Sequence, residues 1–264
     1  MASMRDIKRR KDSIQSTGQI TKAMKLVSTV KLQKAKGRAE NTKPYFDLMY
    51  ETVQSILAKS GHINHKYLKE SESDKKAVIV VTANRGLAGG YNSNITRMII
   101  DEGFTKENTV VYAVGKKGRE LLERKGYEIK ADYSEAINDP IYKDAKEICD
   151  DVLSAFADGE VGEIYLAYTV FKNTVVHEPQ LIRLLPVEAD DAAHETDGSE
   201  ALMTYEPSEE EALDMIIPKY VCSLVYGALI ESVASENGAR MQAMDSATSN
   251  AEDMISDLTL KYNR

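Results

Sequence analysis

Apolar side chains recur at steps near three, four and seven through residues 4–57, a pattern that predicts one long amphipathic helix. The recurring positions are Ile7, Ile14, Ile20, Met24, Val27 and Ala35. Good helix formers dominate the segment, and proline is absent from it before Pro44. Because the helical pattern resumes after Pro44, we expect a kink rather than an end. At 1.5 Å per residue the helix would run roughly 80 Å, so part of it should project beyond any small domain.

A second long helical pattern covers residues 208–264. Ser208 followed by three glutamates is typical of a helix N-cap with a capping-box carboxylate. The pattern continues past Pro218, and its recurring residues become small in the second half of the segment. Small residues along a seam let two helices approach closely. The recurring positions are Leu213, Ile217, Tyr220, Leu224, Ala228, Glu231, Ala234, Gly238, Met241, Thr248, Ala251, Ile255, Leu258 and Tyr262.

Short apolar runs between these helices alternate with helical patterns, which predicts an α/β domain with a parallel or mixed sheet. We expect strands at 77–83, 109–114, 127–131, 163–171 and 180–185, and helices at 91–101, 115–125 and 139–156. We therefore divide the chain into a helix at 1–60, a central α/β domain at 75–190 and a helix at 208–264. The economical arrangement is an antiparallel coiled coil of the two terminal helices with the α/β domain at one end. The alternative is two shorter helices packed flat on the sheet.

Charge is distributed unevenly along the 264 residues. Residues 1–43 carry twelve Lys/Arg and three Asp/Glu, whereas residues 208–264 carry four Lys/Arg and ten Asp/Glu. A basic and an acidic helix in one chain suggest pairing with each other or with charged partners. No apolar run approaches the roughly 18 residues that span a bilayer, and no signal-peptide pattern is present. Cys149 and Cys222 form no CxxC motif, and the four histidines are scattered, so we expect neither a disulfide framework nor a metal site.

Two glycine-rich turns follow predicted strands, at residues 85–90 (RGLAGG) and 115–118 (GKKG). Their spacing matches neither the dinucleotide fingerprint nor the P-loop, so we expect tight turns and no cofactor. No nucleophile elbow, zinc-protease motif or basic–aromatic interleave is present. These observations favour a mechanical or scaffolding protein. The alternatives are a stand-alone nucleotide-binding α/β enzyme, and a coiled-coil scaffold whose basic helix binds nucleic acid or a membrane surface.

Both ends of the chain closely resemble the gamma subunits of rotary F-type ATP synthases, bacterial type. The resemblance is carried by residues 7–10 (IKRR), 17–27 (TGQITKAMKLV), 234–244 (ASENGARMQAM) and 247–251 (ATSNA). The middle of the chain adds residues 85–92 (RGLAGGYN) and 205–207 (YEP). The matches cover essentially the whole chain in family order, although family members usually continue for about twenty residues beyond Arg264. Only Cys149 lies in the central region, so the thiol switch of chloroplast members is not supported.

The resemblance implies a coiled coil of the terminal helices and a Rossmann-like central domain that binds no nucleotide. It implies a non-catalytic central shaft inside a ring of three alpha and three beta subunits. The lower end would join the epsilon subunit and the membrane c-ring, on the cytoplasmic face of the bacterial membrane. The shaft would bind no nucleic acid and would not insert into the bilayer. Whether the coupling ion is H⁺ or Na⁺ stays open.

The matched motifs also suggest which residues face the ring. These are Lys22, Met24, Lys25, Arg240 and Met241, whose basic members would face acidic loops of the catalytic subunits. The alternative for each residue is an exposed coiled-coil position without a partner.

Overall fold

The computed structural model describes residues 4–59, 65–69, 73–187 and 208–263. Two long helices form the two ends of the chain, and the smaller α/β domain lies between them in the sequence. The elements are α1 (Met4–Lys59), β1 (Lys76–Val81), α2 (Tyr91–Asp101), β2 (Thr109–Val114), α3 (Lys116–Arg124), β3 (Glu128–Asp132), the 3-10 turn η1 (Ala136–Asn138), α4 (Tyr142–Ala157), β4 (Glu163–Phe171), β5 (His177–Leu185) and α5 (Glu209–Asn263).

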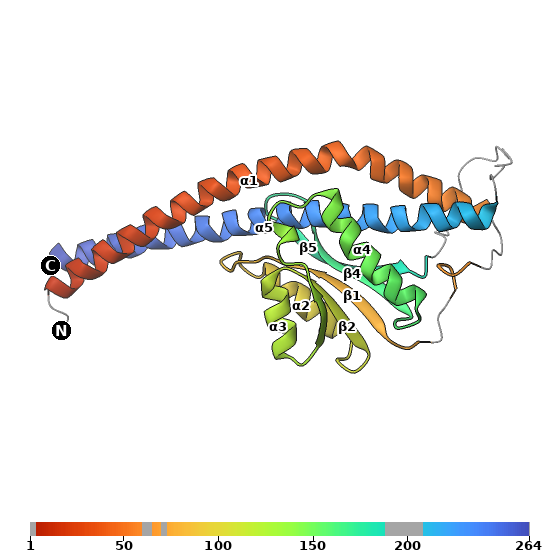
Figure 1. Ribbon diagram of the computed structural model, residues 1–264. Coiled ribbons are helices and arrows are strands. Elements are labelled where there is room, and N and C mark those ends of the chain that lie inside the picture. The colour runs from red at the N-terminus through yellow and green to blue at the C-terminus, as the bar shows by residue number, and fades with distance from the viewer. Residues whose placement is uncertain (1–3, 60–64, 70–72, 188–207, 264) are drawn as a thin grey trace.

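The two long helices lie side by side and run in opposite directions. Their free ends project together as a rod, while the α/β domain lies along the other half (Figure 1). Helix α1 passes through Pro44 as one continuous helix that arches along α5 (Figure 1). The predicted antiparallel pair of terminal helices and the central α/β domain are therefore confirmed.

The sheet has five strands in the order β3-β2-β1-β4-β5. Strands β1 to β4 are parallel to their neighbours, and β5 is antiparallel to β4. Successive side chains of a strand point to opposite faces, so each face has its own core. Val78 and Val80 pack with Ile95 of α2 and Leu122 of α3. On the other face, Ile79 packs in a core that includes residues of α4 and α5.

Helix α5 therefore has two structural roles, one in each half of its length. Its first half lies on the sheet and is mostly buried from Tyr220 onward, and its second half belongs to the projecting rod. The paired arrangement is therefore the one the structure has, and α5 in addition lies on the sheet.

The buried half of α5 also corrects the expectation about apolar runs. Helix α5 contains an 18-residue window with a mean hydropathy of 1.5, long and apolar enough by composition to cross a bilayer. In this protein 56% of that window is buried inside the fold. A core helix in contact with a sheet, α1 and α4 has this same composition.

Several predicted boundaries move by a few residues. Helix α4 begins at Tyr142 instead of 139, because Ile141 is extended and its N–H donates to the Asp144 carboxylate over 2.9 Å. Strand β5 starts at His177 and tolerates Pro179, since it lies at the edge of the sheet. The predicted N-cap is confirmed, as the Ser208 hydroxyl accepts a hydrogen bond from Glu211 N–H.

The two cysteines come together although they are far apart in sequence. Cys149 of α4 and Cys222 of α5 are free thiols, and both are buried. A hydrogen bond between them raises the pKa of Cys149. Within the described residues no group of His, Cys, Asp or Glu is arranged to hold a metal ion.

One prediction concerns the turn between β2 and α3. Gly115 has φ +121°, and a Cβ there would lie 2.1 Å from the main-chain oxygen of Thr82. We expect Gly115→Ala to lower the free energy of unfolding by about 3 kcal/mol, through backbone strain and this clash. Gly103 also has a positive φ, but open space surrounds it. Gly103→Ala should therefore cost only about 1 kcal/mol. If both variants lost the same free energy of unfolding in urea, the contact between residue 115 and Thr82 would not be the cause of the loss.

Candidate functional site along the paired helices

The outer part of the helix pair is held together by small and polar residues. A Cβ added at Gly18 would lie 3.4 Å from Ala251 Cβ, so the two backbones approach closely there. One turn further along α1, the hydroxyls of Thr21 and Thr248 are 2.8 Å apart. The close packing predicted for glycines of α1 holds at Gly18. It does not hold at Gly37, which has open space around it.

Nearer the α/β domain the contact between the helices becomes apolar. Leu32 and Ala35 of α1 are buried against Ala234 of α5, with Met241 packed beside them. Further along, a Cβ at Gly227 would lie 3.1 Å from the Phe46 ring. The pair is therefore in contact from the rod to the domain, which favours a stiff shaft.

The structure overturns two of the predicted seam positions. Ile20 and Val27 face solvent, with exposures of 61% and 58%. The true seam passes through Gly18, Thr21, Ser28, Leu32 and Ala35, at steps of three, seven, four and three residues. The physical reason is that the more apolar face of this segment is not the face that meets α5.

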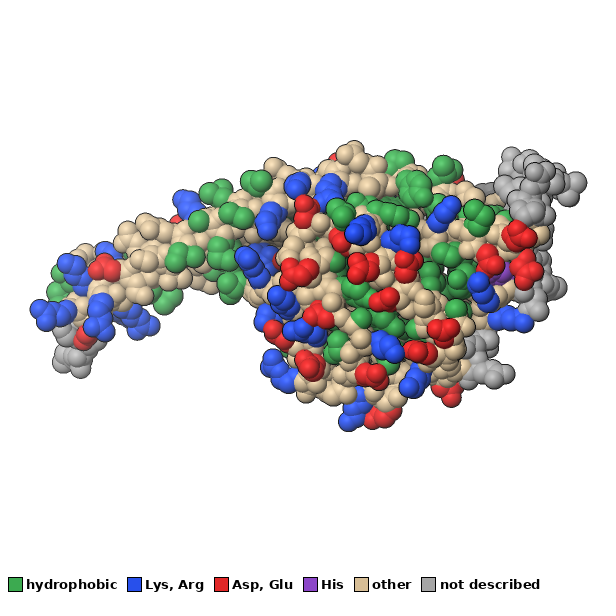
Figure 2. Space-filling view, viewed as in Figure 1, with side chains coloured by type: hydrophobic (Ala, Val, Ile, Leu, Met, Phe, Trp, Pro, Cys, Tyr) green, Lys and Arg blue, Asp and Glu red, His purple; other side chains and the backbone are tan. Residues whose placement is uncertain are grey.

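That outward face carries four large apolar residues, which we call the outer strip. Its members are Ile20, Leu26, Val27 and Val30, each about three-fifths exposed or more. Figure 2 shows hydrophobic side chains spaced along the projecting rod. Leu87, at the tip of the glycine-rich turn, is 65% exposed and lines the same groove as Ile20 and Val27. A run of exposed apolar residues on a helix marks a surface that binds a partner.

The predicted ring-facing residues of α1 surround this strip. Lys22 is exposed, and Met24 is half-buried at the edge of the groove. Lys25 forms an ion pair with Asp245 of α5 over 2.6 Å. The Lys25 ammonium is therefore already engaged within the chain.

Arg240 and Met241 lie at the junction between the helices and the α/β domain. Arg240 pairs with Glu236 over 2.5 Å, and both side chains are mostly buried. Arg240 also donates to the main-chain oxygens of Arg85 and Gly86, over 3.4 and 3.2 Å. Met241 packs in the apolar seam. These residues therefore join α5 to the glycine-rich turn and to α1.

Two serines extend this junction into the sheet. The Ser235 hydroxyl donates to Thr169 O of β4 over 3.1 Å, and the Tyr91 hydroxyl of α2 donates to Ser232 O over 3.1 Å. On the other side, Arg38 of α1 pairs with Asp139 and donates to Pro140 O. Both long helices are thus fixed to the domain by buried or half-buried hydrogen bonds.

The second glycine-rich turn is closed by groups of the chain itself. The Thr82 hydroxyl accepts from Gly118 N–H over 2.8 Å, and Asn84 Oδ1 accepts from Lys116 N–H over 2.9 Å. A Cβ at Gly118 would lie 2.6 Å from that hydroxyl. These two N–H groups at the start of α3, a position that in other proteins can hold a phosphate, are therefore used by the loop after β1.

Sequence reasoning missed Leu26, Val30 and Leu87 as exposed residues. A signal was present, because Leu26 and Val30 are apolar residues outside the recurring positions predicted to face α5. An apolar residue outside a repeat can indicate either a broad core face or a partner surface, and only packing separates the two.

Comparison with known proteins agrees with these features. A family model described as ATP synthase matches residues 3–264. The ATP synthase gamma chain of Lachnoclostridium phytofermentans is 68% identical over all of this chain and 93% of its own length. The sodium ion specific gamma chain of Acetobacterium woodii is 41% identical over 99% of this chain and 92% of its own. A solved structure of the central stalk and c-ring of the Tetrahymena thermophila mitochondrial ATP synthase matches with a TM-score of 0.65 and 26% identity, covering 86% of this chain and 99% of the other.

A pair of substitutions tests the junction. Arg240→Met removes one member of a mostly buried ion pair and leaves the Glu236 carboxylate without its partner. We expect a loss of about 3 kcal/mol in the free energy of unfolding. Lys25→Met breaks a pair that is far more exposed, so we expect a loss below about 1 kcal/mol. Adding Glu236→Gln to Arg240→Met should recover much of the larger loss. A similar small effect of both methionine variants in urea unfolding would show that Arg240 does not hold the junction.

Proposed function

The chain belongs to the ATP synthase gamma chain family, and we propose on that basis that it is the central rotor of an F-type ATP synthase. It couples ion flow through the membrane c-ring to ATP synthesis and hydrolysis in a ring of three alpha and three beta subunits. The observation that carries this proposal is the outer strip on a helix pair already packed along its opposite side. The strip requires a surrounding partner that presents apolar residues.

The rotor acts on the ring as an asymmetric ligand. One shaft inside a threefold ring contacts each of the three interfaces differently at any moment. An effector shifts an equilibrium only by its differential affinity for the competing conformations. As the shaft rotates, the outer strip contacts each of the three interfaces in turn. A different catalytic site is therefore open at each position of the shaft.

Transmission of torque requires a stiff shaft fixed to its base. The close approach at Gly18 and the apolar cluster around Leu32 hold the two helices together. The hydrogen bonds of Ser235 and Arg240 attach the shaft to the α/β domain. In this assignment the α/β domain joins the epsilon subunit and the c-ring, and the projecting rod enters the alpha–beta ring.

The subunit is non-catalytic in this proposal, and the catalytic sites lie at the alpha–beta interfaces. The start of α3 is occupied by Thr82 and Asn84, which argues against the alternative of a nucleotide-binding enzyme. The basic residues of α1 are spread around a helix that is paired with α5, which argues against a nucleic-acid scaffold. The subunit would be peripheral, on the cytoplasmic face of the bacterial membrane. The relatives include a sodium-specific gamma chain, so both H⁺ and Na⁺ fit as coupling ions.

Within the proposed interface the five residues in the matched motifs have different parts. Lys22 and Met24 flank the outer strip and contact the ring directly. Lys25, Arg240 and Met241 stabilise the helix pair through their contacts within the chain. Their solvent-exposed atoms contact the ring.

Co-expression with the alpha and beta subunits of a close relative tests the function. We expect the chain to copurify with both subunits, and we expect the ATPase activity of the complex to depend on its presence. An ATPase of unchanged activity without this chain, with the chain eluting alone, would contradict the proposal.

A substitution in the outer strip tests the interface. Val27→Asp places a charge at an exposed position, so the fold should keep its melting temperature. Burying that charge against an apolar ring should cost more than 1.4 kcal/mol, and coupled ATP synthesis in membrane vesicles should fall at least about tenfold. Gln33→Asp, at an exposed position of α1 outside the strip, is the matched control. Synthesis rates as high for Val27→Asp as for the control would rule out the strip as the ring contact.

A further inference from the structure

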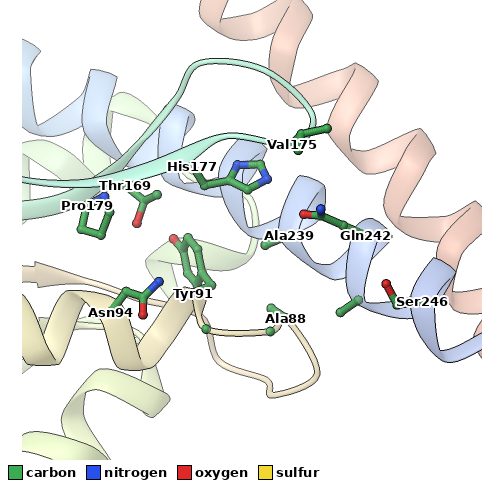
Figure 3. A pocket seen from close by; sticks show the side chains of 13 residues that line it. Ala88, Tyr91, Asn94, Thr169, Val175, His177, Pro179, Ala239, Gln242 and Ser246 are labelled. Carbon is green, nitrogen blue, oxygen red and sulfur yellow. The ribbon is translucent and has the colours of Figure 1, made fainter.

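Buried polar side chains of this protein mostly hold its elements together. Figure 3 shows Tyr91 between the start of α2 and Thr169 of β4, and the Tyr91 hydroxyl donates to Ser232 O of α5 over 3.1 Å. Cys149 of α4 and Cys222 of α5 are different, because their thiols are free, buried and engaged with each other. A thiol is a nucleophile that a small oxidant can convert, so this contact has chemistry as well as packing. The rotor function proposed above uses neither thiol.

The two thiols meet where α4 packs against α5. Cys149 is 1% exposed and Cys222 is 3% exposed, and both belong to the apolar core on that face of the sheet. Val152 of α4 and Val225 of α5, next to them in the same core, are fully buried. A disulfide requires two side chains that already point at each other, and the hydrogen bond between the thiols meets that requirement. Dense packing around them keeps the two sulfurs in contact.

Tyr142, the first residue of α4, borders Cys222 on the solvent side. Its hydroxyl donates a hydrogen bond to the Cys222 sulfur. Its ring packs edge to face on Tyr226 of α5, with the ring centroids 5.8 Å apart. The Tyr142 side chain is 41% exposed, and Ile141 before it is 50% exposed. The route from solvent to Cys222 therefore passes the end of a helix, where local opening costs least free energy.

Hydrogen bonds make the two thiols unequal. The Cys222 sulfur accepts from Cys149 S–H and from Tyr142 O–H, and these bonds lower the pKa of Cys222. The bond to Cys222, together with burial, raises the pKa of Cys149. Lys146 and Asp150 of α4 act on Cys222 in opposite directions, and they pair with each other over 2.6 Å. One stabilised thiolate beside one protonated thiol is the arrangement of an attacking and a resolving cysteine.

We propose that Cys149 and Cys222 form a peroxide-reactive thiol pair in which Cys222 attacks and Cys149 resolves, giving a disulfide that joins α4 to α5. The Cys222 thiolate attacks one oxygen of a hydroperoxide, so an S–O bond forms, the O–O bond breaks, and the leaving oxygen takes up a proton. Cys149 then attacks the sulfur of the resulting sulfenic acid, so the S–S bond forms, the S–O bond breaks, and water leaves with the Cys149 proton. Two thiols and hydrogen peroxide thus give one disulfide and two waters. The sulfurs are oxidised and the peroxide oxygens are reduced.

The disulfide adds a covalent link to the contact that holds α5 on the sheet. Cys149 lies in the middle of α4, and Cys222 lies in the half of α5 that belongs to the core. Linking two residues that are far apart in sequence removes freedom from the unfolded chain, so the oxidised protein is the more stable form. The link is inside the base of the shaft and leaves the outer strip unchanged.

Oxidation of the purified, reduced full chain with a modest excess of hydrogen peroxide tests the pair. We expect the intact mass to fall by two hydrogen atoms and the peptides that contain Cys149 and Cys222 to become linked, and we expect dithiothreitol to reverse both changes. The melting temperature of the oxidised protein should rise by about 5 °C or more. Two thiols that stay free in the folded protein, or sulfinic acids that form without a disulfide, would overturn the proposal.

Substitutions at the two cysteines test their separate roles. Cys149→Ser lacks the resolving thiol, so peroxide should leave a sulfenic acid on Cys222 that dimedone traps. Cys222→Ser lacks the attacking thiol, so Cys149 should stay unmodified under the same conditions. Dimedone trapped on Cys149 in place of Cys222 would show that the roles are not as proposed.

A tyrosine substitution tests the activation of Cys222 without touching either thiol. Tyr142→Phe keeps the ring and removes the hydroxyl, so disulfide formation should slow several-fold. Tyr133→Phe is the matched control, because it removes a hydroxyl that donates to Asp151 of the same helix. Disulfide formation in Tyr142→Phe as fast as in Tyr133→Phe, or faster, would also overturn the proposal.

Discussion

The structure depends on the close approach of two antiparallel helices that are distant in sequence. Gly18 meets Ala251, Thr21 meets Thr248, and the apolar residues around Leu32 continue the contact toward the domain. Because small and polar residues form the outer part of the seam, the apolar residues of that segment are left to point away from it. The close pairing therefore creates the exposed apolar surface that we propose as the ring contact.

The α/β domain is the base to which this helix pair is attached. Helix α5 serves as a core helix in its first half, where it fills one face of the sheet, and as half of the rod in its second. Ser235 and Arg240 lie where the rod leaves the domain, and their hydrogen bonds to β4 and to the glycine-rich turn resist bending there. The first glycine-rich turn thus serves as a mechanical contact, while the N–H groups at the second are used by Thr82 and Asn84.

Much of the fold could be predicted from the sequence, because helical and strand periodicities depend on local residue order. The order of elements, the two terminal helices and the Ser208 cap followed from such patterns. The face of α1 that packs could not be deduced, since Ile20 and Val27 are as apolar as any core residue. Thr21 and Ser28 gave no sign of being buried. The close contact between the His177 ring and Gly238 was equally hidden, because β5 and α5 meet only in the folded chain.

The central claim is that this chain turns as one body inside a ring of alpha and beta subunits. Single-molecule rotation measures this most directly. The ring is fixed to a surface, and a bead is attached to a cysteine introduced by Glu123→Cys on the exposed side of α3, since both native cysteines are buried. The bead should turn in one direction while ATP is hydrolysed. Sustained hydrolysis with a stationary bead would contradict it.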